Sequence, residues 1–236
     1  MDKLIKHVPR GRLDVGHASA LLQLAQASGA RLRTVRAINK TMRFGPILKR
    51  AFYDRPTIDV ARDLLGKILV HGPTAGTIVE TEAYPGGDDF ASHSARGITP
   101  RTRVIFGPPG HAYVYFIYGT YQCLNLVCEP DGTAGCVLIR ALEPLAGIEI
   151  MQSRRPSARK PQDLASGPGK LTLAMAITLQ HNGVDVTRGS LVVREPIEKR
   201  RFEIQTTPRI GISQCVDAPL RFLIAGNHSV SRSAAY

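Results

Sequence analysis

Residues 113–128 read YVYFIYGTYQCLNLVC, and this stretch decides the fold. Two runs rich in aromatic and apolar residues, 113–117 and 122–128, flank the turn-like segment YGTY at 118–121. Runs of this composition form strands, and a short glycine-containing segment between them reverses the chain. The stretch therefore predicts an antiparallel β-hairpin in the middle of the chain.

Further strand and helix patterns lie on both sides of this hairpin. Apolar runs bounded by turn residues predict strands at 67–70, 76–83, 136–141, 190–194 and 220–225. Segments with helical periodicity predict helices at 57–65, 144–154 and 170–180. Thr57 is the candidate N-cap of the first helix, and Gly66 would end it. Because hairpins outnumber strand–helix–strand units, the predicted fold class is α+β, a single mixed domain with a largely antiparallel sheet.

The size and composition limit the class of protein. At 236 residues and 43% hydrophobic, the chain can bury one substantial core. It has no apolar run of the roughly 20 residues that a membrane-spanning helix needs, and no secretory signal pattern. We therefore expect an intracellular protein that does not enter a membrane, cytoplasmic or nucleoid-associated in a bacterium and nuclear or organellar in a eukaryote.

The cysteines and the known binding motifs favour no prosthetic group. Cys123, Cys128, Cys136 and Cys215 form no CxxC pair, and three of them lie in apolar runs. In an intracellular protein this pattern indicates reduced core residues rather than disulfides or a zinc site. There is also no HExxH motif, and no GxGxxG motif follows a strand. We expect no metal and no cofactor.

The net charge of +12 indicates a polyanionic partner, and most of the excess lies near the N-terminus. Residues 1–50 hold 11 Lys and Arg against 2 Asp and Glu, whereas the rest of the chain holds 20 against 17. This distribution predicts a basic extension at 1–45 and a folded domain at 46–236. The extension is compatible with a disordered solvated tail, an over-extended start before Met42, or a transit peptide.

Two acidic residues, Glu80 and Glu82, lie in the otherwise apolar strand segment 78–84. Residues two apart in a strand share a face, so both carboxylates and Tyr84 project to the same side. One interpretation is a solvent-facing sheet edge. The other is a carboxylate that orients and deprotonates a water molecule, and Glu82 is favoured for this role because a loop begins just after it.

The hairpin concentrates aromatic side chains, because four of the seven tyrosines fall between residues 113 and 121. Tyr113 and Tyr115 share one strand face, as ordinary sheet aromatics also do. Tyr118 falls at the turn, where its ring can either fold back onto the hairpin or act as a wedge in a base stack. The hairpin tip is therefore a candidate DNA contact.

A histidine is followed by a group of arginines downstream of the acidic strand. Arg96, Arg101 and Arg103 come shortly after His93. The arginines suggest a loop that meets phosphate, although a lone histidine is more often structural or exposed. His93 therefore remains open between a structural and a binding role at this level.

Two further segments suggest anion binding. Arg140 lies inside the apolar run 137–142, and a buried guanidinium needs an anionic partner, for which Glu82 or a phosphate would serve. The segment SGPGK at 166–170 opens a predicted helix and could bind phosphate through its free N–H groups. It lacks the spacing of a P-loop, so as a motif it is weak.

Taken in order, these segments resemble the 3-methyladenine (alkyladenine) DNA glycosylase family. The matching motifs are IVETEAY at 78–84, HS at 93–94, TPR at 99–101, YVYFIYG at 113–119, Asn125, RALEP at 140–144, SGPGK at 166–170 and PLRF at 219–222. The likeness covers about residues 50–231 and leaves out the basic extension. It is weaker in the loop after His93 and in the segment after Pro196, which leaves the substrate range and the DNA footprint open.

The resemblance implies a curved sheet with flanking helices and a protruding β-hairpin, and an enzyme of base excision repair. Such an enzyme flips an alkylated or deaminated purine out of duplex DNA and hydrolyses its N-glycosidic bond. Glu82 would activate the attacking water, and Arg140 would help to hold it. No lysine stands at the matched pocket positions to form a Schiff base, so we expect a monofunctional enzyme without AP-lyase activity.

The resemblance also implies how the substrate is held. Tyr84, His93 and Tyr115 would line the pocket and stack on the extruded base, and Asn125 would crowd the exocyclic amine of normal guanine. Tyr118 would fill the gap in the duplex. The residues expected to contact DNA are Tyr118, Thr120, Tyr121, Arg101, Arg103 and Lys170. The expected partner is double-stranded DNA that contains damaged purines, bound by a monomer.

Three rival interpretations remain. An enzyme acting on a carbohydrate or free nucleoside would keep Glu80 and Glu82 but would not depend on duplex DNA. A non-catalytic damaged-DNA-binding module of the same fold would lose nothing but affinity on Glu82→Gln. A degenerate enzyme that retains only the fold is disfavoured by the intact pair of Glu82 and Arg140.

Overall fold

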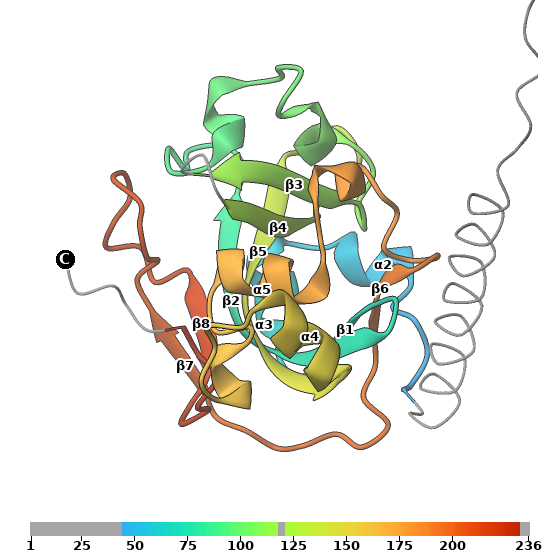
Figure 1. The fold of residues 1–236 in the computed structure, drawn as a ribbon. Coiled ribbons are helices and arrows are strands. Elements are labelled where there is room, and N and C mark those ends of the chain that lie inside the picture. Colours follow the sequence, from blue (N-terminus) through green and yellow to red (C-terminus); the bar gives the residue numbers. More distant parts are fainter. Residues whose placement is uncertain (1–43, 118–120, 232–236) are drawn as a thin grey trace, which may run out of the picture. The chain divides into compact units, whose positions relative to one another are not determined.

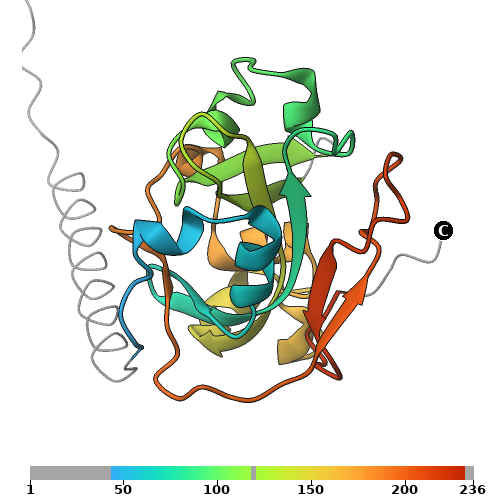
Figure 2. The same cartoon turned by 180° about the vertical axis from the view of Figure 1, so that it is seen from behind.

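The computed structural model describes residues 44–117 and 121–231 (Figure 1). Within these ranges the strands form one antiparallel sheet with short helices against it. Figure 2 shows the sheet from behind, where the strands curl round instead of lying flat. The predicted α+β class with a curved, largely antiparallel sheet is thereby confirmed. The basic extension predicted at 1–45 falls almost entirely outside the described residues and stays a prediction.

Eight strands make up the sheet of the described residues. They are β1 (Ile68–His71), β2 (Thr74–Pro85), β3 (Ala112–Ile117), β4 (Tyr121–Val127), β5 (Gly135–Ala146), β6 (Leu191–Arg194), β7 (Ile204–Thr207) and β8 (Arg221–Ile224). Their order is β3-β4-β5-β2-β1-β6, with β8 paired to β2 and β7 paired to β8. The hairpin predicted from residues 113–128 is confirmed as β3 and β4, which place Tyr115 opposite Cys123. Strand β7 has no counterpart among the predictions, because its side chains are mostly polar and exposed.

The central strand β2 changes partners along its length, and this shapes the site. Strand β5 pairs with one edge of β2 along nearly its whole length. On the other edge, β1 pairs with residues 74–77 and β8 with residues 80–82. The register between β2 and β5 shifts between Ile78 and Thr81, where this change of partner occurs. Such bulges bend a strand, so the half of β2 that carries the two acidic residues is redirected from the first half.

The helices are short. The α-helices are α2 (Arg50–Tyr53), α3 (Thr57–Asp63), α4 (Ile148–Arg154) and α5 (Pro168–Met175), and the 3₁₀ turns are η1 (His93–Arg96), η2 (Arg103–Phe106), η3 (Pro161–Asp163) and η4 (Leu179–His181). The helix predicted at 144–154 is wrong in its first part, because β5 continues to Ala146 and α4 begins only at Ile148. Between them Gly147 has a φ of 66°, and a Cβ there would lie 2.5 Å from the carbonyl oxygen of Pro73. The chain therefore needs glycine to leave the strand before the helix can start.

The helix predicted at 170–180 is wrong at its C-terminal end. Helix α5 ends at Met175, because Ala176 adopts the left-handed conformation with a φ of 53°. A left-handed residue directs the next N–H groups back to the last helical carbonyls and ends the helix. The residues that follow form the separate turn η4 (Leu179–His181).

The capping prediction for α3 is also wrong. Pro56 occupies the N-cap position, and Thr57 is the first helical residue. The cap comes from Glu129, whose carboxylate accepts hydrogen bonds from the Thr57 backbone N–H at 2.6 Å and from Thr57 Oγ1 at 2.8 Å. A negative charge at a helix N-terminus is stabilising, and here it is supplied by a residue distant in sequence.

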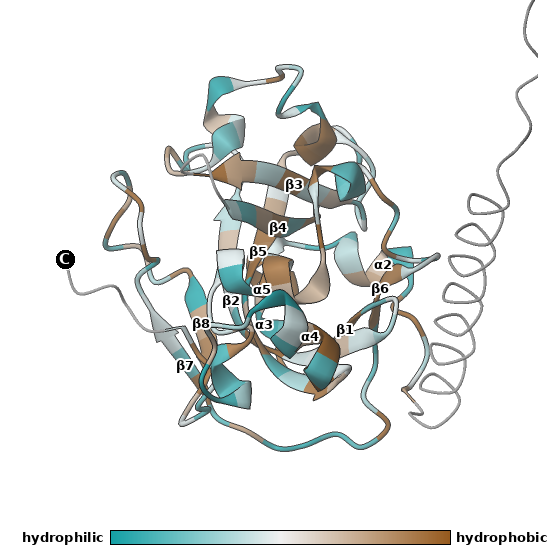
Figure 3. Ribbon diagram, viewed as in Figure 1, coloured by the Kyte–Doolittle hydropathy of each residue, from teal (hydrophilic) through white to brown (hydrophobic). Residues whose placement is uncertain are grey.

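The hydrophobic core lies between the sheet and the helices. Among the largest fully buried side chains are Tyr53, Ile78, Ile139 and Phe222. Figure 3 shows the hydrophobic colouring concentrated on the strands and α5. No helix in the described ranges is both long and apolar enough to span a bilayer.

The four cysteines are free thiols, and three of them belong to the interior. Cys123, Cys128 and Cys136 are buried on β4, just after it and on β5, as predicted. Cys215 is exposed instead, so the prediction that all four are core residues is wrong there. It lies in the irregular segment before β8, where no regular element covers it.

Candidate active site

A cavity of about 730 Å³ opens beside the β3–β4 hairpin. Its walls come from the end of β2, the η1 segment, strands β3, β4 and β5, the first residue of α5, and the loop at 210–214. The cavity therefore joins segments that lie more than 100 residues apart in sequence. Its described lining contains three aromatic residues of β3, which are Tyr113, Tyr115 and Phe116. Apart from the titratable His93, the only ionic side chains among the described lining residues are arginines.

Glu82 is buried immediately behind this wall. One of its carboxylate oxygens forms an ion pair with Arg140 Nη1 at 3.1 Å and accepts a hydrogen bond from the backbone N–H of Ile210 at 2.8 Å. The other oxygen accepts a hydrogen bond from the hydroxyl of Tyr84 at 2.9 Å. All three of these residues line the cavity. The carboxylate is therefore held in one orientation by groups that themselves face the cavity.

Glu80 is also fully buried, so the interpretation of the two acids as a solvent-facing edge is wrong. Its carboxylate accepts hydrogen bonds from Arg140 Nε at 2.9 Å and from Arg221 Nε at 2.7 Å. The backbone N–H and the hydroxyl of Ser231 donate to it at 2.6 and 2.8 Å. Strand β2 lies between two other strands, so neither acid can reach solvent across an edge.

Arg140 connects the two carboxylates. Burial by itself would lower the pKa of Arg140, but the adjacent Glu82 and Glu80 outweigh burial and raise this pKa. Of the two anionic partners considered for Arg140, Glu82 and a phosphate, the structure shows Glu82 at 3.1 Å. The contacts of Arg140 and Arg221 with Glu80 were not predicted, although Glu80 lies in the motif IVETEAY and Arg221 in the motif PLRF. An Arg inside an apolar strand is the signal that could have identified the second acid.

His93, Tyr113 and Tyr115 form an aromatic wall of the cavity. His93 Nδ1 lies 2.9 Å from the hydroxyl of Tyr113, and the His93 ring meets the ring of Tyr115 edge-on with centroids 4.6 Å apart. The guanidinium of Arg101 lies 5.2 Å from the centroid of Tyr115. Burial, followed by the charges of Arg101 and Arg96, lowers the pKa of His93 to about 4. His93 is therefore a neutral imidazole at neutral pH.

Asn125 lies deep in the cavity and is held by two contacts. Its Nδ2 donates to the backbone carbonyl of Tyr113 at 3.2 Å, and its Oδ1 accepts from the thiol of Cys136 at 3.9 Å. The side chain is almost completely buried. These contacts fix the orientation of the amide, so its remaining donor and acceptor positions are fixed as well.

Arg209 and Asp89 form a buried ion pair that was not predicted from the sequence. Arg209 donates from Nη1 and Nη2 to the two oxygens of Asp89 at 2.6 and 2.7 Å, and from Nη1 to the carbonyl of Ala83 at 3.0 Å. Its guanidinium lies 4.6 Å from the ring centroid of Tyr84. The Arg209 guanidinium therefore packs against the ring of Tyr84. The ion pair also connects the residue just before Ile210 to the loop before His93. No local motif could reveal it, because the two residues lie 120 positions apart.

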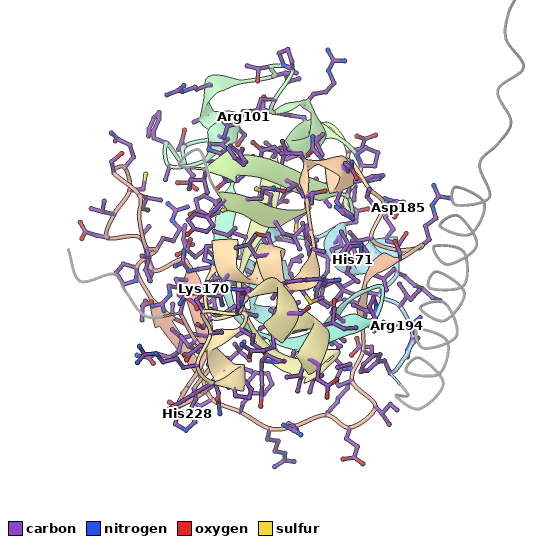
Figure 4. All side chains as sticks on the ribbon, viewed as in Figure 1. His71, Arg101, Lys170, Asp185, Arg194 and His228 are labelled. Atoms are coloured by element: carbon purple, nitrogen blue, oxygen red, sulfur yellow. The ribbon has the colours of Figure 1, made fainter. Side chains whose placement is uncertain are left out.

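The candidate DNA-contacting residues are distributed around the cavity. Figure 4 shows Arg101 beside β3 and Lys170 at the start of α5. Arg103 is exposed but does not line the cavity, and Lys170 is exposed with its Nζ 3.4 Å from Ser166 Oγ. Tyr121 is partly exposed at the start of β4. The remaining two candidates, Tyr118 and Thr120, lie outside the described residues.

The described part of the chain contains no group of three His, Cys, Asp or Glu side chains that could hold a metal ion. The site provides an oriented carboxylate, that of Glu82, beside an aromatic cavity. A carboxylate in this setting can accept a proton from water or stabilise a developing positive charge.

Comparison with known proteins gives one consistent result. The family model for methylpurine-DNA glycosylase matches residues 51–228. A protein of Methanocella arvoryzae named "Putative 3-methyladenine DNA glycosylase" is 54% identical over 198 residues, which cover 80% of this chain and 98% of that protein. A protein of the same name from Methanoculleus marisnigri is 51% identical, and the match covers 78% of this chain and 98% of that protein. Another, from Prosthecochloris aestuarii, is 49% identical, and the match covers 78% of this chain and 91% of that protein.

Proposed function

The chain belongs to the methylpurine-DNA glycosylase family, and from this premise we propose that it is a monofunctional DNA glycosylase of base excision repair. It flips an alkylated or deaminated purine of the 3-methyladenine class out of duplex DNA and hydrolyses the N-glycosidic bond with an activated water. Flipping costs a few kcal/mol, and the cost is least for a damaged, weakly paired base. The substrate is therefore selected partly before it enters the cavity.

The observation that carries the proposal is the position of the Glu82 carboxylate. It forms an ion pair with Arg140 and accepts hydrogen bonds from Tyr84 and the Ile210 N–H, and all three residues line the cavity. In the proposed reaction Glu82 accepts a proton from the water that attacks C1′, and Arg140 orients that water. The C1′–N bond breaks as the C1′–O bond forms, and the purine leaves with the bonding electron pair. An alkylated purine is already cationic, so the enzyme mainly positions water and stabilises an oxocarbenium-like sugar.

Recognition of the base is assigned to the aromatic wall. Tyr84, His93 and Tyr115 stack on the extruded purine, and a cationic base is attracted to their ring faces. The lowered pKa of His93 supports this role, because a neutral imidazole does not repel a cationic base. Asn125, fixed by the Tyr113 carbonyl and Cys136, excludes the exocyclic amine of normal guanine.

Contacts with the duplex are assigned to residues around the cavity. Arg101, Arg103 and Lys170 are exposed cations that neutralise phosphates, and such contacts position a protein on DNA without reading sequence. Tyr118 fills the gap that the extruded nucleotide leaves, and Thr120 and Tyr121 also contact the DNA. The described residues that line the cavity include no lysine, which supports hydrolysis without a Schiff base and hence without AP-lyase activity.

The test is base release from a duplex oligonucleotide that carries one hypoxanthine or ethenoadenine, with alkylated DNA in parallel. Abasic sites are revealed by hot alkali, and strand cleavage without alkali measures AP-lyase activity. We expect the wild type to release base, and Glu82→Gln to release none while it still binds the duplex. Glu149→Gln is the matched control, because it makes the same chemical change at an exposed residue of α4.

The alternative function is a non-catalytic damaged-DNA-binding module of the same fold. It predicts tight binding by the wild type with no base release from any lesion, and no difference between Glu82→Gln and Glu149→Gln. That result would contradict the glycosylase proposal and favour the DNA-binding module.

A further inference from the structure

Phe90 is the most exposed large hydrophobic side chain of the described residues, with 68% of its surface accessible. It lies in the loop between β2 and η1, and it lines the mouth of the cavity that contains His93 and Tyr115. A phenylalanine ring in water is unfavourable unless a partner covers it. Because Phe90 lies at the opening of the proposed active site, we expect that partner to bind at this opening.

The loop around Phe90 is held in place on both sides. Asp89 is buried and binds Arg209 through both carboxylate oxygens. Ser92 is buried as well, where its hydroxyl contacts Ser94 Oγ at 2.7 Å and accepts from the Ser94 N–H. The N–H of Ala91 donates to Asp89 Oδ1 at 3.3 Å. The exposure of Phe90 is therefore imposed by its buried neighbours rather than by a loose loop.

The surroundings of Phe90 combine apolar and positively charged groups. Phe116 of β3 lines the same mouth with 47% of its surface exposed. Arg96 and Arg101 also line it and are exposed, and no Asp or Glu is among the described lining residues. Aromatic rings beside cations are the combination that binds nucleic acid, because the rings stack on bases and the cations neutralise phosphates.

We propose that the loop at 88–91 is a second DNA-contacting element in which Phe90 packs against the nucleotides that flank the extruded purine. This inference rests on the proposed glycosylase function. When a nucleotide leaves the helix, its neighbours lose a stacking partner and expose an apolar face. Phe90 covers that apolar surface, while the neighbouring arginines hold the adjacent phosphates. Its contact is made only with a distorted duplex, so it favours damaged over intact DNA.

The test compares Phe90→Ala and Phe90→Trp with the wild type. The dissociation constant is measured by fluorescence anisotropy for a duplex with one tetrahydrofuran abasic analogue and for the same duplex undamaged. Loss of one aromatic stacking contact weakens binding by roughly tenfold, so we expect that loss for Phe90→Ala on the abasic duplex and little change on the undamaged one. Phe90→Trp retains a ring and should bind the abasic duplex like the wild type.

Ile98→Ala is the matched control. Ile98 is exposed to almost the same degree, at 66%, but it does not line the cavity. We expect its affinities to equal those of the wild type, and melting curves should show that each variant is folded. If Phe90→Ala binds the abasic duplex like the wild type, or weakens both duplexes equally, the inference is wrong.

Single-turnover base release at saturating enzyme separates this inference from the proposed function. The wild type and the control Ile98→Ala are both measured, and we expect Ile98→Ala to keep the wild-type rate, because Ile98 does not line the cavity. If the wild type releases no base, the proposed function fails whatever the affinities are. If the wild type is active and Phe90→Ala loses no affinity for the abasic duplex, only the inference fails.

Discussion

Arg140 Nε lies 2.9 Å from a carboxylate oxygen of Glu80, and both side chains are buried. The arginine that contacts Glu82 is thus itself held by a second acid, two residues earlier on β2. Arg221 binds the same Glu80 oxygen at 2.7 Å. The four ionic groups balance in charge, which is how two carboxylates can remain together in the interior.

Replacing Glu80 should therefore destabilise the fold strongly. Glu80→Gln removes the carboxylate that Arg140 and Arg221 share, so that Arg221 loses its buried carboxylate and Arg140 keeps only Glu82. Breaking a buried ion pair costs about 3 kcal/mol or more. The measurement is the free energy of unfolding in urea. Glu143→Gln is the control, because Glu143 is only partly buried and accepts one side-chain hydrogen bond, from Asn227 at 3.1 Å, so its loss should cost about 1 kcal/mol or less. Equal losses for the two variants would contradict this account.

Tyr84→Phe should slow base release without abolishing substrate binding. The substitution removes the hydroxyl that donates to Glu82 at 2.9 Å and keeps the ring at the cavity. A hydrogen bond to a charged group contributes about 1.5–3 kcal/mol, so we expect a loss of at least roughly tenfold in the single-turnover rate.

The control for Tyr84→Phe is Tyr53→Phe, because the Tyr53 hydroxyl is buried and has no hydrogen-bond partner among the described residues. That variant should keep wild-type activity. A Tyr84→Phe enzyme as fast as the wild type would show that the hydroxyl does not hold Glu82 for the reaction.

Protonation of His93 should occur only in acid. Burial and the charges of Arg101 and Arg96 lower the pKa of His93 from 6.5 to about 4. Between these values the unfolded chain binds a proton that the folded chain does not, so the contribution of His93 to stability is present above about pH 6.5 and decreases as the pH falls towards 4. Urea unfolding at a series of pH values should show this decrease in the wild type, and a smaller one in His93→Gln.

The contribution of Arg101 to this pKa can be tested separately. Arg101→Gln removes one of the two nearby positive charges, so the pKa of His93 should rise, as measured by NMR titration of the imidazole. Arg103→Gln is the control, since Arg103 does not contribute to the lowered pKa of His93. The same shift in both variants would show that Arg101 has no specific influence.

The cysteines should differ sharply in reactivity. Burial raises the pKa of the Cys123 thiol to about 11 and that of the Cys136 thiol to about 12, and it raises the pKa of Cys128 as well. The thiolate is the reactive form, so iodoacetamide at pH 8 should alkylate only the exposed Cys215 in the folded protein. Mass spectrometry should find one adduct in buffer and four in urea. Rapid alkylation of Cys123 in the folded protein would mean that the cavity wall opens.

Local pattern was sufficient to predict most of the strands. The hairpin at 113–128, the strand at 67–70 and the late strand at 220–225 all agree with the structure to within about two residues. Alternating or continuous apolar runs bounded by turn residues specify a strand wherever one face is buried. The order of the motifs likewise identified the family, because motifs are read along the sequence and do not depend on which residues contact one another in the fold.

The tertiary structure decided where elements end and which charges pair. Helix α4 starts late because β5 keeps its pairing with β2 as far as Ala146, and α3 is capped by Glu129 from another part of the chain. Strand β7 has little apolar pattern of its own and forms because it pairs with the edge of β8. Such features depend on partners that are distant in sequence, so no local pattern contains them.

The sequence by itself determined that Glu80, Glu82 and Arg140 are unusual residues for the strands that carry them, since a carboxylate or a guanidinium in an apolar run needs a partner. Only the tertiary structure decided that Glu80 binds Arg140 and Arg221 and that Asp89 binds Arg209. The physical reason is desolvation: a charge leaves water only where the fold brings an opposite charge to it. Which opposite charge that is depends on how the strands pair, and strand pairing is a property of the whole chain.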